Sequence, residues 1–327
     1  MMEILVTIPV QPQHKISLEN AVKGTKAEGQ VHFTYLTQAE VTKDQICHAD
    51  IILGNVAPEY LKAAEHLKFM QLDSAGADAY TEQGILPKGA MLANATGAYG
   101  PTMSEHMLGC ALMLLKRLYL YQGNMQKHVW RDEGKVQSIT DSTTLIIGMG
   151  DIGSNFAMKM HALGSHVIGI RRNKAKRPDY LDELYQMDSL DSLLPRSDIV
   201  ACSLPGTKET EHMLDASRLG RMKKGAILIN VGRGSLIPTN DLYEALAGGH
   251  LGGAAIDVTE EEPLPEDSRL WDAPNLLITP HISGNYHTQH ILESVVQIAT
   301  YNLRVFLEDG KIQNEVDFQT GYRKYIG

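Results

Sequence analysis

The stretch Thr144-Leu145-Ile146-Ile147-Gly148-Met149-Gly150-Asp151-Ile152-Gly153 decides the fold of this chain. Residues 144–147 are apolar apart from Thr144 and predict a short buried strand, and three glycines follow at the spacing G-x-G-x-x-G. Beyond the glycines, apolar residues recur at helical spacing, at Ile152, Phe156, Met160 and Leu163. The glycines are therefore expected to lie on a turn between a strand and a helix.

Each glycine of this turn has a physical reason to be there. Gly148 allows a tight turn, Gly150 lets the backbone approach a pyrophosphate, and Gly153 lets the helix pack closely on the strand. The helix that opens with Asp151 and Ile152 would direct its free N–H groups and the positive end of its dipole at the pyrophosphate. The stretch predicts a dinucleotide-binding unit of the Rossmann type.

The residues after the next strand bear on the choice of cofactor. The strand predicted at 166–170 ends in Arg171-Arg172, where an NAD-binding unit is expected to place an Asp or Glu for the adenosine ribose. A carboxylate would repel the 2′-phosphate of NADP, whereas a guanidinium pairs with it. The alternative is that both arginines are merely solvated. The pattern favours NADP, with NAD as the second possibility.

Composition excludes several classes of protein. The 327 residues suit two domains, and a net charge of -9 without a long block of one sign argues against nucleic-acid binding. The three cysteines are far apart and show no C-x-x-C spacing, which indicates reduced thiols. No signal-peptide pattern opens the chain and no run of 18 apolar residues occurs. We therefore expect a cytoplasmic protein without a membrane span.

The first hundred residues predict a parallel α/β domain without a glycine fingerprint. Short apolar runs alternate with helical patterns, and the strands are expected at 4–8, 51–53, 69–72 and 91–93. Ser74, Ala75 and Gly76 follow one of these strands at its carboxyl end, where open α/β sheets bind ligands. From the residues alone, an ordinary turn is the alternative.

The rest of the chain predicts a complete second sheet. A long helix at 102–121 is expected to lead into it, with its methionines in the core or at a subunit interface. Six strands alternate with helices and are expected at 144–147, 166–170, 198–204, 226–231, 253–258 and 276–279. A last helix at 286–308 and the tail should fold back onto the first domain. We thus expect a substrate-binding domain of residues 1–100 plus 285–327 and a dinucleotide-binding domain of residues 101–284.

Three strand ends in the second domain carry reactive side chains. Arg233 lies between two glycines, Glu262 closes an acidic run, and His281 follows the last strand. Separately, they could be a turn residue, a solvated loop and a packed histidine. At one sheet edge, beside a nicotinamide, they are the groups needed to reduce a 2-oxo acid.

These motifs together resemble the D-isomer-specific 2-hydroxyacid dehydrogenases, which include glyoxylate/hydroxypyruvate reductases and 3-phosphoglycerate dehydrogenases. The resemblance rests on the segments 148–153, 204–210, 230–234, 253–258 with 262–263, and 279–281. It implies two doubly wound parallel-sheet domains, with a Rossmann cofactor domain inserted in a flavodoxin-like substrate domain. It also implies that Arg233, Glu262 and His281 are catalytic.

The resemblance further implies the binding residues. Besides the glycine loop and the two arginines, the cofactor is expected to contact Leu204, Pro205, Thr210, Val231, Gly232 and Asp257, the last through the nicotinamide carboxamide. The substrate carboxylate would meet the N–H groups of Ser74, Ala75 and Gly76, and Arg233. Tyr99 and Tyr286 lie close to motif positions, where they either line the substrate pocket or simply pack.

The expected reaction is hydride transfer from the nicotinamide to C2 of a 2-oxo acid, while His281 gives a proton to the forming alkoxide. Glu262 would hydrogen-bond the other imidazole nitrogen, and Arg233 would grip the carboxylate and carbonyl oxygen. The resemblance also implies a homodimer. Which 2-oxo acid is preferred is not fixed by the sequence.

Two alternatives remain. Transcriptional corepressors that bind C-terminal peptide motifs resemble the same segments, and they would make this chain a cofactor-sensing binding protein. His281, His287 and His290 lie close in sequence, but no Cys or H-E-x-x-H arrangement accompanies them, so no metal site is expected.

Overall fold

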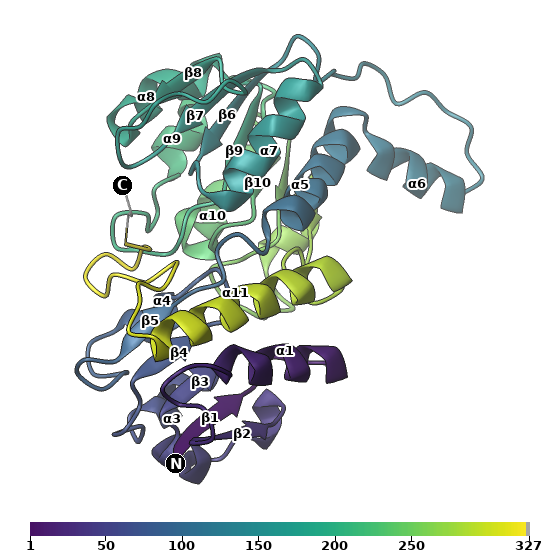
Figure 1. The fold of residues 1–327 in the computed structure, drawn as a ribbon. Helices are drawn as coiled ribbons and strands as arrows, with labels where there is room; N and C mark the ends of the chain where they lie inside the picture. Colours follow the sequence, from purple (N-terminus) through teal and green to yellow (C-terminus); the bar gives the residue numbers. More distant parts are fainter. Residues whose placement is uncertain (325–327) are drawn as a thin grey trace. The chain divides into compact units, whose positions relative to one another are not determined.

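The computed structural model describes residues 1–324 and divides the chain into two compact units. Unit 1 combines Met1–Tyr99 with the chain from Tyr286 onward, and unit 2 is Gly100–Asn285 (Figure 1). Unit 2 is thus an insertion within the chain of unit 1. The end of the predicted tail, residues 325–327, lies outside the described part.

Unit 1 contains a five-stranded parallel sheet with the order β2-β1-β3-β4-β5, which is the flavodoxin-like order. Its strands are β1 (Met2–Val6), β2 (Val31–Tyr35), β3 (Ile51–Leu53), β4 (Phe69–Gln71) and β5 (Met91–Ala93). Four of them confirm the predicted strands. The edge strand β2 was not predicted, because Val-His-Phe-Thr-Tyr has no continuous apolar run and its residues are only partly buried or exposed.

The helices of unit 1 are α1 (Pro12–Val22), α2 (Lys43–His48), α3 (Pro58–Leu61), α4 (Asp78–Thr81) and α11 (Gln289–Leu307). The long helix α11 packs beside α1, and both belong to the same unit although they lie at opposite ends of the chain (Figure 1). After α11 the chain returns to the sheet, where the Val316 N–H donates to Leu92 O at 2.8 Å and Val316 is buried. The tail therefore completes the sheet edge of unit 1.

Unit 2 contains a seven-stranded parallel sheet with the order β12-β11-β10-β9-β6-β7-β8. This is the Rossmann arrangement, in which the first strand, β6, lies inside the sheet and the strand order changes direction between β6 and β9. The strands are β6 (Thr143–Ile147), β7 (His166–Ile170), β8 (Glu183–Tyr185), β9 (Ile199–Cys202), β10 (Ile227–Asn230), β11 (Gly253–Ile256) and β12 (Leu276–Ile278). All six predicted strands are present, and β8 is an additional edge strand.

The helices of unit 2 are α5 (Gly100–Leu115), α6 (Leu118–Gln126), α7 (Asp151–Ala162), α8 (Leu190–Leu193), α9 (Ala216–Arg221) and α10 (Thr239–Ala247). The prediction of one continuous helix at 102–121 is wrong in part, because Arg117 takes a left-handed backbone conformation with φ of 55° and separates α5 from α6. Figure 1 shows α6 and the loop after it standing away from the sheet of unit 2.

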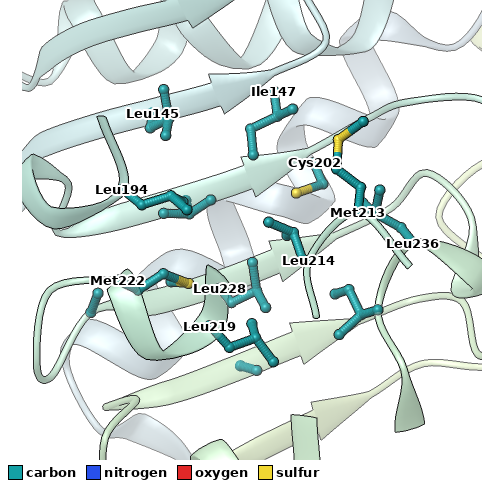
Figure 2. Packing of buried hydrophobic residues seen from close by; sticks show 14 of the residues in the cluster. Leu145, Ile147, Leu194, Cys202, Met213, Leu214, Leu219, Met222, Leu228 and Leu236 are labelled. Atoms are coloured by element: carbon teal, nitrogen blue, oxygen red, sulfur yellow. The ribbon is translucent and has the colours of Figure 1, made fainter. Parts of the chain in front are cut away.

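One face of the unit 2 sheet is covered by a large apolar cluster. Figure 2 shows Leu145, Cys202 and Leu228 on neighbouring strands, packed with side chains such as Leu194 and Leu219 from the covering segments. These residues are at most 2% exposed. Since the strands are buried on both faces, their carboxyl ends are held rigidly, and the loops that carry the predicted site start from these ends.

Candidate active site

The glycine loop between β6 and α7 has the geometry that the sequence predicts. Gly148 has a φ of 106°, and a Cβ atom on Gly153 would lie 2.0 Å from the Gly148 carbonyl oxygen. A Cβ on Gly150, in contrast, would meet no atom within 4 Å. The outer two glycines are thus required by the fold itself, while the space over Gly150 is open to a ligand.

The amino end of α7 suits an anion. Gly150 occupies the N-cap position and no side chain caps the helix, so its first N–H groups remain available to a phosphate. The carboxylate of Asp151 points elsewhere and accepts a hydrogen bond from the Gly100 N–H at 2.8 Å, where α5 begins. Backbone N–H groups rather than the Asp151 side chain therefore offer the contacts to a pyrophosphate.

The two arginines follow β7 and are shaped by the unpredicted strand β8. The Arg171 N–H donates to Tyr185 O at 3.1 Å, and Gln186 Nε2 donates to Arg172 O at 3.1 Å. Hydrogen bonding by Thr207 and, to a smaller degree, the charge of Arg172 hold the pKa of Glu209 below its usual value. Arg172 thus lies near the segment that contains the predicted cofactor residues 204–210.

The side chain of Thr210 stabilises the segment 204–210 through hydrogen bonds to its backbone. Its hydroxyl is buried, donates to Pro205 O at 2.8 Å and accepts from the Thr207 N–H at 2.9 Å. Leu204 is 8% exposed and would touch a Cβ at Gly148 at 3.0 Å, so it underlies the glycine loop. Leu204 and Thr210 therefore support the cofactor loops, and their direct contact with a cofactor stays a prediction.

The turn that carries Arg233 is built by Asn230. The Asn230 side chain accepts from the Gly232 N–H at 3.0 Å and donates to Arg233 O at 2.9 Å. Val231 is buried, and a Cβ on Gly232 would lie 2.5 Å from Leu204 O. The guanidinium of Arg233 also donates to Gly232 O at 2.9 Å, which fixes its direction.

The loop with Arg233 packs directly on the loop with Glu262. A Cβ on Gly234 would lie 1.9 Å from the Thr259 carbonyl group, so the two backbones are in contact. Glu262 Oε1 in turn accepts from the Thr259 N–H at 3.1 Å. The strand ends of β10 and β11 thereby bring the cation and the carboxylate to the same sheet edge.

His281 pairs with Glu262, as the resemblance implied. The distance from His281 Nδ1 to Glu262 Oε2 is 2.7 Å, and the two side chains are 50% and 39% exposed. Because Nδ1 faces the carboxylate, Nε2 is the nitrogen left to exchange a proton with a ligand. Arg233, Glu262 and His281 follow the neighbouring strands β10, β11 and β12 and form one set within unit 2.

The sequence does not predict the hydrogen-bond network around Asp257 that holds the loop with His281. Asp257 is 2% exposed, and its carboxylate accepts from the Thr279 hydroxyl at 2.6 Å and from the N–H groups of Ile282 and Ser283 at 3.0 Å. The His281 N–H donates to Asp257 O at 2.8 Å. Hydroxyl residues on either side of a strand-end histidine are the signal that could have revealed this clamp. The contact of Asp257 with a nicotinamide stays a prediction.

The loop 74–76 in unit 1 directs its carbonyl groups inward. Ser74 O accepts from the Ala95 N–H at 2.9 Å, Ala75 O from Asn94 Nδ2 at 2.8 Å, and Gly76 O from the Ser74 hydroxyl at 2.7 Å. Within residues 1–324, the N–H groups of Ala75 and Gly76 make no hydrogen bond. These two adjacent backbone donors are therefore available to an anionic ligand.

None of the helices in the described part of the chain is long and apolar enough to cross a membrane. Across residues 1–324, no group of three or more His, Cys, Asp and Glu side chains is arranged to hold a metal ion.

The fold and this site define an oxidoreductase that binds a nicotinamide dinucleotide. The sequence model described as "D-isomer specific 2-hydroxyacid dehydrogenase, NAD binding domain" matches residues 108–283. The chain therefore belongs to the D-isomer specific 2-hydroxyacid dehydrogenase family, and it is an NAD(P)-dependent enzyme with two parallel-sheet α/β domains.

Individual relatives agree with this membership. Glyoxylate/hydroxypyruvate reductase B of Pectobacterium carotovorum is 32% identical over 242 residues, 72% of this chain and 74% of that protein. A family member from Aeromonas salmonicida has a similar structure, with a TM-score of 0.83 and 32% identity over 97% of this chain and 99% of the other. The NADPH-dependent glyoxylate/hydroxypyruvate reductase of Sinorhizobium meliloti, solved with NADP and sulfate, has a TM-score of 0.81 and 27% identity over 98% and 100%.

Proposed function

We propose that this enzyme reduces a small 2-oxo acid to the D-2-hydroxy acid with NADPH. The observation that carries the proposal is the 2.7 Å pair of His281 and Glu262 at the carboxyl edge of a Rossmann sheet, where the loop with Glu262 packs against the loop with Arg233. An acid, its orienting carboxylate and a cation are the groups that carbonyl reduction requires.

The residues present fit the cofactor, because the space over Gly150 is open and the start of α7 is uncapped. The nicotinamide, when bound, supplies the hydride. His281 gives a proton from Nε2 to the oxygen that becomes the hydroxyl, and Glu262 keeps the ring in the orientation that leaves Nε2 outward. Arg233 draws electron density toward the carbonyl oxygen and holds the substrate carboxylate.

The substrate carboxylate also needs uncharged donors, and the free N–H groups of Ala75 and Gly76 are suited to that role. They lie at the carboxyl end of β4, where sheets of this kind bind ligands. Ser74 fastens the loop through its hydroxyl, so its own contribution is to the loop conformation.

The preference for NADPH is supported by the arginines after β7. A guanidinium at Arg171 or Arg172 can pair with a 2′-phosphate, and no carboxylate follows this strand directly to repel one. The Sinorhizobium relative, which is NADPH-dependent, carries NADP in its structure.

The first experiment is an initial-rate panel of glyoxylate, hydroxypyruvate, pyruvate, phenylpyruvate and 2-oxoisocaproate, each with NADPH and NADH. Arg171→Ala should raise the KM for NADPH at least about tenfold, because a charge-assisted pair is lost, and leave the KM for NADH nearly unchanged. Lys174→Ala, a loss of exposed charge three residues away, is the matched control. Equal rates of the unmodified enzyme with both cofactors would refute the cofactor preference, and no rate with any acid would refute the function.

We further propose a homodimer and a cytosolic location. The location is supported by the free thiols of Cys47, Cys110 and Cys202. The dimer is supported by exposed apolar side chains on α6 and the loop that follows it, which are Leu118, Met125, Val129, Trp130 and Val136.

A further inference from the structure

Asn94 is a buried amide that the proposed reaction does not use. It follows β5 directly and is 5% exposed. Its Nδ2 donates to Ala75 O at 2.8 Å, and its Oδ1 accepts from the Thr96 N–H at 3.2 Å and from the Thr96 hydroxyl at 2.8 Å. A backbone N–H can only donate and a carbonyl oxygen can only accept, so these contacts fix which end of the amide faces which residue. The amide therefore joins the end of β5 to the proposed substrate loop.

The contact with Asn94 sets the direction of the peptide between Ala75 and Gly76. This peptide is trans, and in a planar trans peptide the C=O and N–H bonds point in opposite directions. Since Ala75 O is turned toward Asn94, the Gly76 N–H points away from it. The preceding peptide is held likewise, because the Ala95 N–H donates to Ser74 O at 2.9 Å and the Ala75 N–H is turned away. Both donors thus face away from the end of β5, in a loop that is partly exposed.

The tail of unit 1 supports Asn94. The Asn94 N–H donates to Asn314 O at 3.2 Å, and Asn314 Nδ2 donates to Thr96 O at 2.7 Å. The tail brings Asn314 to this point because it returns from α11 to β5, where Ala93 and Glu315 form an antiparallel bridge. All of these residues belong to unit 1, so the support of the loop lies within one compact unit. Asn94 is therefore fixed through both its backbone and its side chain.

The two ends of the Asn94 amide have separable roles. Its Oδ1 accepts from the N–H of Thr96, two residues further on, and so closes an Asx turn that an aspartate would close equally well. Its Nδ2 contributes nothing to that turn and instead donates to Ala75 O. An amide rather than a carboxylate at position 94 is thus needed for the loop and not for the turn.

We propose that Asn94 is a positioning residue for the substrate, which holds the Ala75–Gly76 peptide so that its N–H can donate to the substrate carboxylate. The inference rests on the proposed function, because it takes the loop 74–76 as the site of that carboxylate. Without Nδ2, Ala75 O loses its donor, and the peptide can turn this oxygen toward the carboxylate, which it repels. A donor to a charged group is then replaced by an acceptor, so the affinity for the substrate falls.

The test compares the unmodified enzyme with Asn94→Asp, Asn94→Ala and Thr7→Val, using the acid of the panel that the unmodified enzyme reduces best. Asn94→Asp keeps the size and the acceptor for Thr96 but places an oxygen against Ala75 O. Asn94→Ala removes the donor without adding a charge. Both should raise KM at least about tenfold, because a hydrogen bond to a charged group is lost. The kcat and the Kd for NADPH should change little, since only substrate binding is weakened.

Thr7→Val is the matched control for a loss of stability. Thr7 is 3% exposed and its hydroxyl donates to Asn55 O at 2.9 Å, at the end of β1, which β3 separates from β4. This substitution also deletes a buried hydrogen bond of unit 1 and should lower Tm, yet KM should equal that of the unmodified enzyme. A purely structural role of Asn94 would give the same pattern in all three variants, a lower Tm with unchanged KM.

Hydrogen exchange, measured by mass spectrometry, provides a second readout that needs no variant. Oxamate resembles a 2-oxo acid and carries one carboxylate. In the presence of NADP⁺, and at a concentration that inhibits turnover, it should slow the exchange of the Ala75 and Gly76 N–H groups in the unmodified enzyme. Asn94→Ala should show less protection at the same concentration. An unprotected loop in the unmodified enzyme would overturn the inference even if both Asn94 variants failed to fold.

The outcomes separate this inference from the proposed function. Efficient reduction by the unmodified enzyme together with an unchanged KM in the Asn94 variants would overturn the inference and leave the function standing. An equal rise of KM in Thr7→Val would do the same, because the effect would then not be specific to the loop. Reduction of no acid by the unmodified enzyme would overturn both.

Discussion

His281 has a backbone φ of 51°, a left-handed conformation that is uncommon for residues other than glycine, although histidine adopts it more often than most. The conformation is maintained because Asp257 receives hydrogen bonds from Thr279, Ile282 and Ser283 on either side of it. The imidazole is then directed by Glu262 at 2.7 Å. Loop and ring are thus fixed by separate hydrogen bonds, as the proposed role of His281 as proton donor requires.

His281→Ala should lower kcat by about 10²- to 10⁴-fold, the usual contribution of a positioned general acid. The dissociation constant for NADPH should change little, because the glycine loop is untouched. Stopped-flow turnover and fluorescence titration of the cofactor check the two quantities. His287→Ala, which changes an exposed histidine nearby in the sequence, should retain full turnover, and full turnover in His281→Ala would rule out this role.

Some residues of the site can be predicted from the sequence, but the contacts between distant residues cannot. Arg233, Glu262 and His281 could be predicted because each follows a recognisable strand, and neighbouring parallel strands end at one edge. The hydrogen bond from the Tyr286 hydroxyl to Asp73 joins residues 213 positions apart, and the clamp on Asp257 spans up to 26 positions. No local pattern encodes such contacts, since they depend on how loops close after the sheets have formed.

Among the elements, the turn from β6 to α7 separates requirements of folding from requirements of binding. Gly153→Ala should destabilise the protein by about 1–3 kcal/mol, because its Cβ would fall 2.0 Å from the Gly148 carbonyl oxygen. Gly150→Ala should leave Tm unchanged, as its Cβ meets no atom within 4 Å and its φ is -86°. It should nevertheless raise the Kd for NADPH at least about tenfold, by filling the space for the pyrophosphate.

Thermal unfolding without cofactor and cofactor titration measure the two effects on the same pair of variants. Each glycine serves as the control for the other. A lower Tm for Gly150→Ala without cofactor, or undiminished NADPH affinity, would show that the open space has another use.

The strand β8 was not predicted because its stability comes from side chains rather than from an apolar pattern. Only Leu184 is apolar between Glu183 and Tyr185, and all three residues are partly exposed. Glu183 accepts hydrogen bonds from the Tyr185 hydroxyl at 2.6 Å and pairs with His166 at 2.7 Å and Arg196 at 2.6 Å. Hydrogen bonding by Tyr185, with His166 and Arg196, lowers the pKa of Glu183 to about 2.

This lowered pKa predicts an acid-dependent loss of stability. The unfolded chain has a Glu pKa of about 4.3, so Glu183 stabilises the fold above that pH and the contribution is lost as the pH falls toward 2. Glu183→Gln should lower Tm at pH 6 and flatten the decline of Tm between pH 5 and pH 3 relative to the unmodified protein. Calorimetry checks this, with Asp188→Asn as an exposed control. Parallel Tm curves for Glu183→Gln and the unmodified protein would contradict the assignment.

The break between α5 and α6 at Arg117 could not be predicted from local sequence. The residues around Arg117 are good helix formers, and nothing local stops the helix. The guanidinium of Arg117 donates to Glu133 O at 2.6 Å, so a contact with the returning loop compensates for the left-handed turn. Tertiary contacts override propensity at this point.

At the scale of the whole molecule, the exposed apolar residues of α6 and its loop predict the mode of assembly. Trp130 is fully exposed and Met125 is 75% exposed, an arrangement that a lone soluble domain rarely shows. A second copy of the chain is the proposed cover, consistent with two-fold symmetric pairing as the commonest assembly.

Trp130→Glu should leave a monomer in place of the proposed dimer, because a charge would have to be buried at the proposed interface. Light scattering coupled to size-exclusion chromatography measures the change. Trp271→Glu is the matched control, since Trp271 is 54% exposed on another part of unit 2 and its ring donates to Pro265 O. A mass equal to two chains in Trp130→Glu would place the interface elsewhere.

The insertion of unit 2 within unit 1 also determines the order in which the two units can fold during protein synthesis. A ribosome makes β1 to β5 first, but α11 is made only after all of unit 2, a delay of about 10 to 40 seconds at ordinary elongation rates. Until then Phe69 lacks the ring of Phe306, which stacks on it at 5.0 Å in the finished fold. The part of the enzyme that begins first is thus completed last, and a nascent chain spends that interval with one apolar sheet face uncovered and available to chaperones.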